Sequence, residues 1–403
     1  MCLGRALANC THTLLRLSRD SATQLAFAGR TQTTEGKEGG LSLLSPVAVP
    51  RTMPSTMSIA DRWEVRTGKE VGEGGFGKVY MAFDGSEDPP LEVAAKKVPL
   101  KNDADHKGFR EELSVLKTVH DHGSIITLMG DAEETGVGWM FMEMASGGEL
   151  FDRLIESGSL SEKAAWPYVR GLVEALAHCH SKGVVHRDVK LENVMLCAED
   201  PRAVRLIDFG LALQLDIAEG EPGGIAPNQT IKDPAGTQAY RAPEVSRAGY
   251  EPSKVDVWST AIVLFSLASG FFPLQEAHPS DWRFKKLAAQ QADGLGACEA
   301  LYNMYKRNCP FSPALRELLN GMLEIDPAKR LSLSAVLSSE WLSTDPCGAA
   351  DADDDDDKPV YRSASGDGDF GDAGAPVELT EDMIPICRQR AKRVVDADAD
   401  AFA

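Results

Sequence analysis

The chain has 403 residues, of which 43% are hydrophobic and 26% charged, a balance typical of a globular protein with room for more than one lobe or domain. Its formal net charge is −19, and residues 343–403 alone contribute −10, with 16 acidic and 6 basic residues. Nucleic-acid binding requires a basic surface, so we expect no nucleic-acid partner and favour a basic substrate.

No apolar run reaches about 18 residues, so we predict no transmembrane helix and no membrane partner. The eight cysteines form no C-x-x-C pair and no metal-type spacing, which favours reduced thiols in a cytoplasmic or nuclear compartment. Residues 1–34 carry four arginines, one acid and many Ser and Thr, which is typical of an organelle transit peptide. A leader without fixed structure fits the same composition. So does a translation start placed upstream of the true start codon, in which case Met53 or Met57 would be the first residue.

Regular patterning begins near Asp61. Residues 63–83 alternate like two paired strands around a glycine cluster, and residues 91–100 and 138–145 predict further strands. Between these strands, residues 107–120 place apolar side chains at helical spacing.

Helical patterns dominate after that, at 149–157, 162–183, 255–270 and 312–325. A small β-rich part therefore precedes a larger helical part, and Trp341-Leu342 closes the patterned region. We therefore predict three divisions: a leader at 1–60, a domain at 61–342, and an acidic tail without fixed structure at 343–403. Within the domain, a hinge at 143–148 separates a first lobe at 61–143 from a second lobe at 149–342.

The glycine cluster "VGEGGFGKV" has the G-x-G-x-x-G arrangement at Gly72, Gly74 and Gly77. A dinucleotide site would place a helix directly after these glycines, but a strand pattern follows, so the loop lies in a hairpin. Glycines let backbone N–H groups approach phosphate oxygens closely. An ordinary glycine-rich hairpin is an equally good interpretation of this stretch alone.

Lys96 lies in "VAAK", on the strand after the loop, where an ammonium group would hold phosphates as a point charge. Lys97 lies on the opposite strand face. Glu112 or Glu111 on the following helix would pair with Lys96, and we favour Glu112 because it directly precedes the apolar Leu113.

Taken in order, these motifs resemble the eukaryotic protein kinases of the serine/threonine type, over about 280 residues from Asp61 to Leu342. To the glycine loop and "VAAK" the chain adds "HRDVKLEN" at 186–193, "DFG" at 208–210, "APE" at 242–244, "DVWS" at 256–259 and Arg330 in "IDPAKR". The larger lobe looks most like the calcium/calmodulin-dependent and checkpoint-type kinases. The resemblance implies an α+β fold of two lobes: a small antiparallel sheet with one long helix, then a larger, mostly helical lobe.

The resemblance also implies the catalytic residues. Asp188 would orient the substrate hydroxyl, Lys190 would neutralise charge on the moving phosphoryl group, and Asn193 and Asp208 would hold Mg²⁺. Lys96 with Glu112 would complete the set, and His186 would have a structural role, hydrogen-bonding the backbone.

ATP is the cofactor that the resemblance implies. Apolar side chains would cover and back the adenine ring, and the backbone of Glu143 and Ala145 would pair with its edge. The residues expected to bind ATP are Val71, Gly72, Glu73, Gly74, Gly75, Phe76, Gly77, Val79, Ala94, Lys96, Met142, Glu143, Ala145, Glu149, Met195 and Asp208.

Lys190 and Thr237 resemble serine/threonine rather than tyrosine kinases, so the expected partners are proteins with Ser or Thr. Glu149 and Glu192 match positions that read an arginine upstream of the target. The rival interpretations are a pseudokinase-like scaffold and a kinase for a small molecule or lipid. Intact Lys96, Asp188, Asn193 and Asp208 argue against the scaffold, and the intact "GTQAYRAPE" segment argues against the small-molecule kinase.

Two features concern regulation. Many relatives carry a phosphorylated Thr where this chain has Asp233. We therefore hypothesise that Asp233 replaces the phosphate by pairing with Arg187. An acidic loop residue with no such role is an equal alternative. Thr230 is the fallback phosphorylation site. In the tail, "MIPICRQRAKRVV" at 383–395 resembles a calmodulin-type or autoinhibitory helix, but Pro385 interrupts it and favours a basic patch without fixed structure.

Overall fold

The structure is a computed structural model that describes residues 56–74, 77–217, 225–226, 229–247 and 249–346. Segment 1–34, the tail beyond residue 346 and its basic stretch 383–395 lie outside the described residues. Within the described ranges, no helix is both long and apolar enough to cross a membrane.

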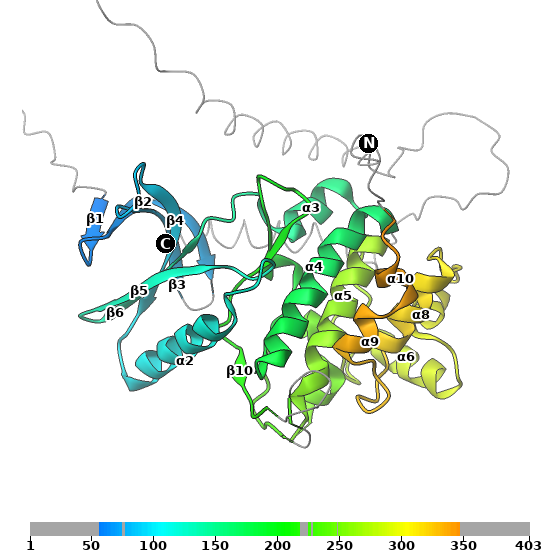
Figure 1. Cartoon of the computed structure of the whole chain (residues 1–403). Coiled ribbons are helices and arrows are strands. Elements are labelled where there is room, and N and C mark those ends of the chain that lie inside the picture. The colour runs from blue at the N-terminus through cyan, green and yellow to red at the C-terminus, as the bar shows by residue number, and fades with distance from the viewer. Residues whose placement is uncertain (1–55, 75–76, 218–224, 227–228, 248, 347–403) are drawn as a thin grey trace, which may run out of the picture. The chain divides into compact units, whose positions relative to one another are not determined.

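The smaller lobe is built on a six-stranded antiparallel sheet in the order β1-β2-β3-β4-β6-β5 (Figure 1). Gly74 pairs with Gly77 across the turn between β2 and β3, so the predicted glycine hairpin is confirmed. The strands are β1 (Thr56–Ile59), β2 (Trp63–Gly74), β3 (Gly77–Asp84), β4 (Leu91–Pro99), β5 (Leu128–Glu134) and β6 (Val137–Glu143).

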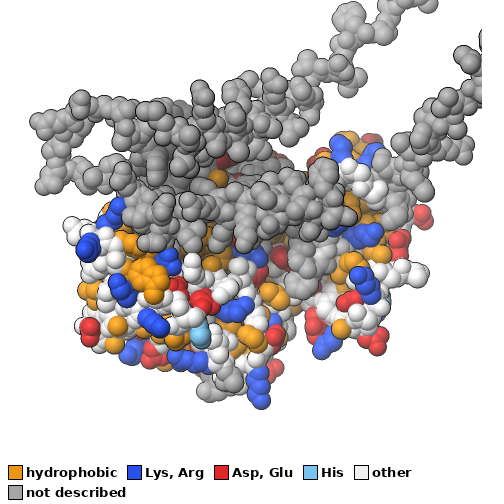
Figure 2. All heavy atoms as spheres, turned by 180° about the vertical axis from the view of Figure 1, so that it is seen from behind, with side chains coloured by type: hydrophobic (Ala, Val, Ile, Leu, Met, Phe, Trp, Pro, Cys, Tyr) orange, Lys and Arg blue, Asp and Glu red, His pale blue; other side chains and the backbone are white. Residues whose placement is uncertain are grey.

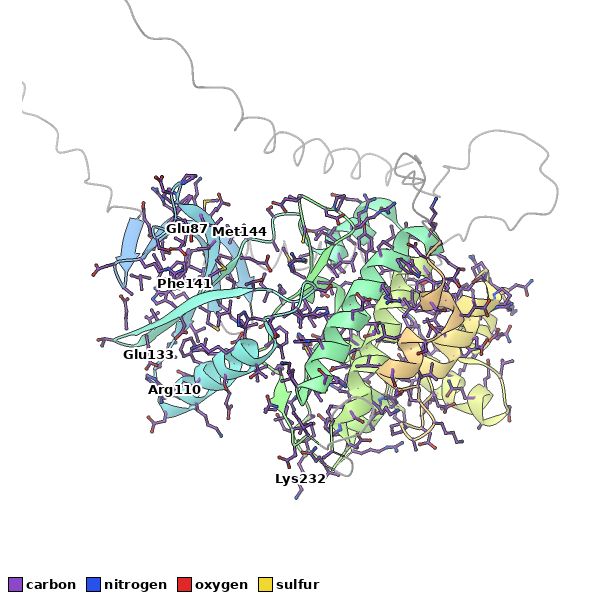
Figure 3. The ribbon with its side chains drawn as sticks, viewed as in Figure 1. Glu87, Arg110, Glu133, Phe141, Met144 and Lys232 are labelled. Atoms are coloured by element: carbon purple, nitrogen blue, oxygen red, sulfur yellow. The ribbon has the colours of Figure 1, made fainter. Side chains whose placement is uncertain are left out.

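Helix α2 (Asp103–Val119) covers one face of this sheet and begins four residues before the predicted helix. The side chain of Asn102 explains that start, because it accepts hydrogen bonds from the backbone N–H groups of residues 104 and 105. The ring of Phe109 lies so close to Gly138 of β6 that a Cβ there would be 2.6 Å from it. Figure 3 shows Arg110 of α2 beside Glu133 of β5, and these side chains form an ion pair of 3.4 Å.

The opposite face of the sheet carries its own apolar cluster, centred on aromatic side chains. Trp63 and Phe141 stack with ring centroids 4.1 Å apart, and Ile59 from β1 is fully buried with them. Since Trp139 and Phe141 belong to this cluster while Met140 packs toward α2, both faces of β6 are buried.

The larger lobe is mostly helical, and α5 is its central element. Thirteen of the fifteen residues of α5 are buried, as expected of a helix that is apolar on all sides. α5 packs on α4 and α8, and α4 packs on α9. The helices are α3 (Leu150–Ser157), α4 (Glu162–Ser181), α5 (Val255–Ser269), α6 (Trp282–Ala292), α7 (Ala297–Asn303), α8 (Pro313–Met322), α9 (Leu333–Leu337) and α10 (Glu340–Ser343).

Four short strands form two small antiparallel pairs next to the first lobe: β7 (Val184–Val185) with β10 (Leu213–Gln214), and β8 (Val194–Leu196) with β9 (Val204–Leu206). They flank the segments 186–193 and 207–212, where most of the predicted catalytic residues lie. The α+β fold of two lobes is thus confirmed.

Candidate active site

The register of the small lobe's sheet gathers the predicted ATP-binding side chains on one face. Val79 of β3 lies opposite Lys96 of β4, and Ala94 lies opposite Met142 of β6. Residues directly opposite in antiparallel strands share a face, and residues two apart on one strand do too. Val79, Ala94, Lys96 and Met142 therefore face the same side, the side that α2 covers.

Lys96 is almost fully buried between two carboxylates from different elements. Its Nζ lies 2.5 Å from Glu112 Oε1 on α2 and 3.1 Å from Asp208 Oδ1, which follows β9. Burial alone would lower the pKa of the ammonium group, but the attraction of the two carboxylates outweighs burial and raises it. The charged lysine therefore joins the sheet and α2 to the larger lobe.

Of the two glutamates considered from sequence, Glu112 is the one that points inward. Glu111 instead forms an exposed pair with Lys107 at 3.7 Å, one helical turn earlier. Helical geometry separates neighbouring residues by about 100° around the axis, so only one of the two faces the sheet.

Asp256 at the start of α5 holds the beginning of the catalytic segment in place. Its carboxylate is fully buried and accepts hydrogen bonds from the backbone N–H groups of His186 and Arg187, each 2.9 Å, and from His180 Nε2 at 2.8 Å. Arg187 has a φ of +66°, a left-handed conformation that a non-glycine residue adopts only when surrounding contacts impose it. These hydrogen bonds are the contacts that impose it here.

His186 hydrogen-bonds the backbone, in agreement with its predicted structural role. Its Nε2 donates to the carbonyl oxygen of Ile207 at 3.1 Å, and its Nδ1 accepts from the N–H of Asp188 at 3.3 Å. The ring also packs edge-on against Phe209, with centroids 4.9 Å apart. The histidine thus ties the segment that bears Asp188 to the segment that bears Asp208.

Asp188 stands at the centre of a hydrogen-bond cluster. Its Oδ1 accepts from the backbone N–H of Thr237 at 2.8 Å and from the Thr237 hydroxyl at 2.7 Å. Its Oδ2 accepts from Lys190 Nζ at 2.7 Å and from Asn193 Nδ2 at 3.2 Å. Burial by itself would raise the pKa of this carboxyl group. The hydrogen bond and positive charge of Lys190, together with the hydrogen bond from Thr237, outweigh burial and lower the pKa below the usual range. Asp188 is therefore ionised at neutral pH.

The donor atoms suit Mg²⁺ held jointly with phosphate oxygens. Asn193 Nδ2 donates both to the Asp188 backbone carbonyl, at 2.8 Å, and to its side chain, which leaves the amide oxygen as the group offered to a cation. Asp208 supplies a second hard oxygen donor, and burial raises its pKa less than the charge of Lys96 lowers it. No group of three or more His, Cys, Asp and Glu among the described residues could hold a metal ion alone.

The remaining predicted ATP residues lie in two places: beside the segment between the lobes, and in the glycine hairpin of β2 and β3. Met195 of β8 bridges to Glu149, and the N–H of Gly147 donates to the Leu196 carbonyl at 3.0 Å. The side chain of Glu143 accepts from Thr127 and from Arg205 Nε at 2.9 Å, so its carboxylate is engaged in the structure of this segment. Val71 is half exposed, and Gly72 lies opposite Val79. Gly75 and Phe76 lie outside the described residues, as does the side chain of Glu73. Gly74 ends β2 at the glycine hairpin, and Ala145 lies between β6 and α3.

The activation segment, which runs from Asp208 to Glu244, contacts the catalytic loop, residues 186–193, at Arg187. Its side chain is mostly buried and donates from Nε to the carbonyl of Leu211 at 2.7 Å. Its Nη1 lies 3.6 Å from Asp233 Oδ2, beyond normal hydrogen-bond length, and the Asp233 side chain is 74% exposed. Asp233 and Arg187 are therefore near each other in a loose ion pair.

Sequence reasoning named neither Thr237 nor Asp256 as a site residue. Thr237 was used only to distinguish kinase types, yet it bonds Asp188 twice and accepts from Lys190 Nζ at 3.1 Å. The signals that could have found them are the "GT" before "QAYRAPE" and the "DVWS" motif, both far along the chain from the loop they hold.

The fold and the arrangement around Asp188, Lys96 and Asp208 define a domain of the protein kinase class. The protein kinase domain family model matches residues 65–342. Calcium-dependent protein kinase 7 of Arabidopsis thaliana is 31% identical over 279 residues, covering 68% of this chain and 48% of that protein. CBL-interacting serine/threonine-protein kinase 13 of the same plant is 33% identical over 296 residues, covering 72% and 52%.

A third relative, CBL-interacting protein kinase 11 of Oryza sativa subsp. japonica, is 32% identical over 287 residues. The match covers 70% of this chain and 51% of the length of that protein. The chain spans about half the length of the curated relatives it matches. The chain belongs to the protein kinase domain family.

Proposed function

We propose that this protein is a serine/threonine protein kinase that transfers the γ-phosphoryl group of ATP to Ser or Thr hydroxyls of proteins. The observation that carries the proposal is the Asp188 carboxylate, fixed by Thr237, Lys190 and Asn193 and ionised at neutral pH. In phosphoryl transfer the protein supplies mainly placement and charge, so a fixed carboxylate beside a lysine is the arrangement the reaction needs.

Each residue has a distinct task in this proposal. Asp188 accepts the hydrogen bond of the substrate hydroxyl and orients its oxygen for attack. Lys190, already 2.7 Å from Asp188, stabilises negative charge on the group in transfer. Lys96 holds the phosphates of the nucleotide, positioned by Glu112. Mg²⁺, held by Asp208 and the Asn193 amide oxygen, would neutralise phosphate charge.

Phosphotransfer to an arrayed Ser/Thr peptide library, with Mg²⁺ and radiolabelled ATP, tests this function. We expect transfer by the unmodified chain and a loss of at least about 100-fold in Asp188→Asn and Asp208→Asn. Asp293→Asn is the matched control, because Asp293 is an exposed residue just after α6, and it should retain full activity. Nucleotide binding without transfer to any peptide would instead favour the scaffold, and transfer only to small molecules or lipids would favour the second rival.

We also propose that the substrates carry an arginine upstream of the target residue. Glu149 lies at the start of α3, and Glu192 lies in the catalytic loop, where its Oε2 accepts from the Tyr240 hydroxyl at 3.1 Å. Bidentate bonds between a guanidinium group and these carboxylates would select arginine. Replacing the upstream arginine by alanine in the preferred peptide should raise KM about tenfold, and Glu149→Gln should remove that preference while kcat stays unchanged. Equal KM values for both peptides in the unmodified chain would refute this specificity.

Activity without activation-segment phosphorylation is the third part of the proposal, and it rests on Asp233 near Arg187. An ion pair at 3.6 Å whose acidic partner is exposed is worth at most about 1 kcal/mol, so Asp233→Ala should lower the rate of phosphatase-treated enzyme by about two- to fivefold. Asp233→Glu should retain the rate. Thr230→Ala controls for the alternative phosphorylation site, and an unchanged rate in Asp233→Ala would contradict the replacement of phosphate by Asp233.

A calmodulin-type regulator is the remaining proposal on partners, and it rests on the basic segment 383–395. Of the three relatives described above, one has "Calcium-dependent" in its name and two have "CBL-interacting". Titration of the full chain with calcium-loaded calmodulin tests it, with Arg390→Glu/Arg393→Glu as the variant. Binding that persists in this variant would place the regulator elsewhere.

A further inference from the structure

An exposed tryptophan surrounded by lysines lies on the larger lobe, away from the catalytic residues. We define the α6 surface as Trp282, Lys285 and Lys286 of α6 together with Lys306, which follows α7. Trp282 is 43% exposed and is one of only four large hydrophobic side chains among the described residues that are exposed to this degree. A large aromatic side chain at such a position is a feature of interaction surfaces.

The indole ring is held in a fixed orientation. The guanidinium group of Arg283 and the ammonium group of Lys286 lie 5.1 and 5.2 Å from the Trp282 ring centroid. Arg283 is itself buried and donates from Nε to the hydroxyl of Tyr305 at 3.0 Å, and the Tyr305 ring meets the indole edge-on. The exposed part of the ring is therefore presented as a rigid surface, which lowers the entropy lost on binding.

The charge of the α6 surface is strongly positive for so acidic a protein. Residues 282–310 carry five basic and two acidic residues, whereas the whole chain has a net charge of −19. No carboxylate of the described part of the chain pairs with Lys285, Lys286 or Lys306. The side of the larger lobe that carries α6 lies at the left of Figure 2, where hydrophobic side chains lie among lysines and arginines. An acidic ligand with an aromatic residue complements such a surface.

We propose that the α6 surface binds the acidic tail of the same chain, residues 351–372. This segment contains nine Asp against Lys358 and Arg362. Its last part, "DGDFGD" at 367–372, places Phe370 between carboxylates and so offers both an aromatic ring for Trp282 and charges for the lysines. The negative charge of the segment is opposite to that of the α6 surface. The aromatic ring and the carboxylates that the surface requires both occur within the six residues 367–372.

The chain is long enough to reach the α6 surface. The described part of the chain ends at Pro346, just after α10, and α10 packs on α8, α8 on α7 and α7 on α6. Pro346 and Phe370 are 24 residues apart, and a random-coil linker of that length spans roughly 25–30 Å on average. Since the tail is tethered, its effective concentration is of the order of millimolar, so weak contacts suffice for occupancy.

Zero-length carbodiimide coupling of Lys to Asp in the full chain, read by mass spectrometry, tests the proposal without a kinase assay, so its outcome is independent of the proposed function. We expect intramolecular links from Lys285 or Lys286 to residues 351–372, with a yield that falls at 0.5 M salt, where the Debye length is only about 4 Å. Trp282→Ala and Phe370→Ala should each reduce this yield about fivefold, since both keep the coupling groups but remove an aromatic partner.

The matched control is Leu91→Ala, which removes an equally exposed hydrophobic side chain from the smaller lobe and should leave the yield unchanged. Links from the tail mainly to its own Lys392 would overturn the proposal, because the acidic run would then neutralise the basic segment of the tail. Links found only between two chains would overturn it as well, in favour of a second copy as the ligand. An unchanged yield in both aromatic variants would exclude docking at Trp282.

Discussion

Replacing Asp256 by asparagine should separate the placement of the catalytic loop from its chemistry. The three donors on this buried carboxylate are the N–H groups of His186 and Arg187 and the Nε2 of His180, at 2.8–2.9 Å. An asparagine of the same shape keeps one oxygen and turns an NH₂ group toward at least one of these donors.

The magnitude follows from the bonds lost. If the amide oxygen takes the place of Oδ2, the bond from Arg187 is lost and its buried N–H is left without an acceptor. A hydrogen bond to a charged group is worth about 1.5–3 kcal/mol, so we expect a loss of about 1.5–3 kcal/mol in the free energy of unfolding. Without that bond the left-handed conformation of Arg187 is no longer imposed, and a shift of about 1 Å at Asp188 lowers kcat about 100-fold.

Two assays on Asp256→Asn check this prediction: urea unfolding followed by circular dichroism, and kcat for the best library peptide. KM for ATP should change little, because Lys96 and Asp208 lie outside the three bonds. Asp293→Asn, an exposed residue with the same chemical change, should leave both quantities as they are. A variant that loses less than about 1 kcal/mol and keeps kcat within threefold would refute the role assigned to these hydrogen bonds.

Three further predictions concern other contacts. Thr237→Ala removes the hydroxyl bonded to Asp188 and should lower kcat about tenfold, whereas Thr237→Ser should keep most of the rate, as measured by the peptide assay. Arg330→Ala should lower the free energy of unfolding in urea by about 3–5 kcal/mol, because it leaves Glu244 buried without its bidentate partner. If a Glu244→Gln/Arg330→Met double variant is no more stable than Arg330→Ala, this cause is contradicted. The hydrogen bond from Arg62 holds the pKa of Asp84 below its value in the unfolded chain, which is about 4. The ionised Asp84 carboxylate therefore stabilises the fold fully above about pH 4, and this stabilisation is lost as the pH falls below it. The stability difference between the unmodified chain and Asp84→Asn should therefore shrink from pH 6 to pH 3 in thermal unfolding scans, and a constant difference would exclude this linkage.

The local parts of the fold and site could be predicted from the sequence, and the distant ones could not. Alternation around the glycine cluster was enough to predict the hairpin, and "HRDVKLEN" contains the whole catalytic loop. The preference for Glu112 over Glu111 rested on one neighbouring apolar residue, and the structure pairs Glu112 with Lys96.

The failures share a physical reason. Strand β1 is only four residues long and β5 carries several charges, so neither shows a clear period of two. Thr237 bonds Asp188 from 49 residues away, and Asp256 bonds His186 and Arg187 of the same loop from 70 and 69 residues away, separations that no local pattern reports. The α6 surface likewise depends on the packing of Tyr305 against Trp282 and Arg283, and Tyr305 lies outside α6.

The short edge strand β1 has a practical consequence for anyone who expresses this domain separately. The family match begins at residue 65, so a recombinant fragment cut at that limit would lack β1 and also Trp63, which stacks on Phe141. Strand β2 would then begin at Val65, and Val65 and Arg66 would lose their partners in β1, which leaves backbone groups unpaired at an open edge, where other chains can pair as strands and aggregate. A fragment that keeps residues 56–64 retains the protected edge, and its yield of monomer should be the higher of the two.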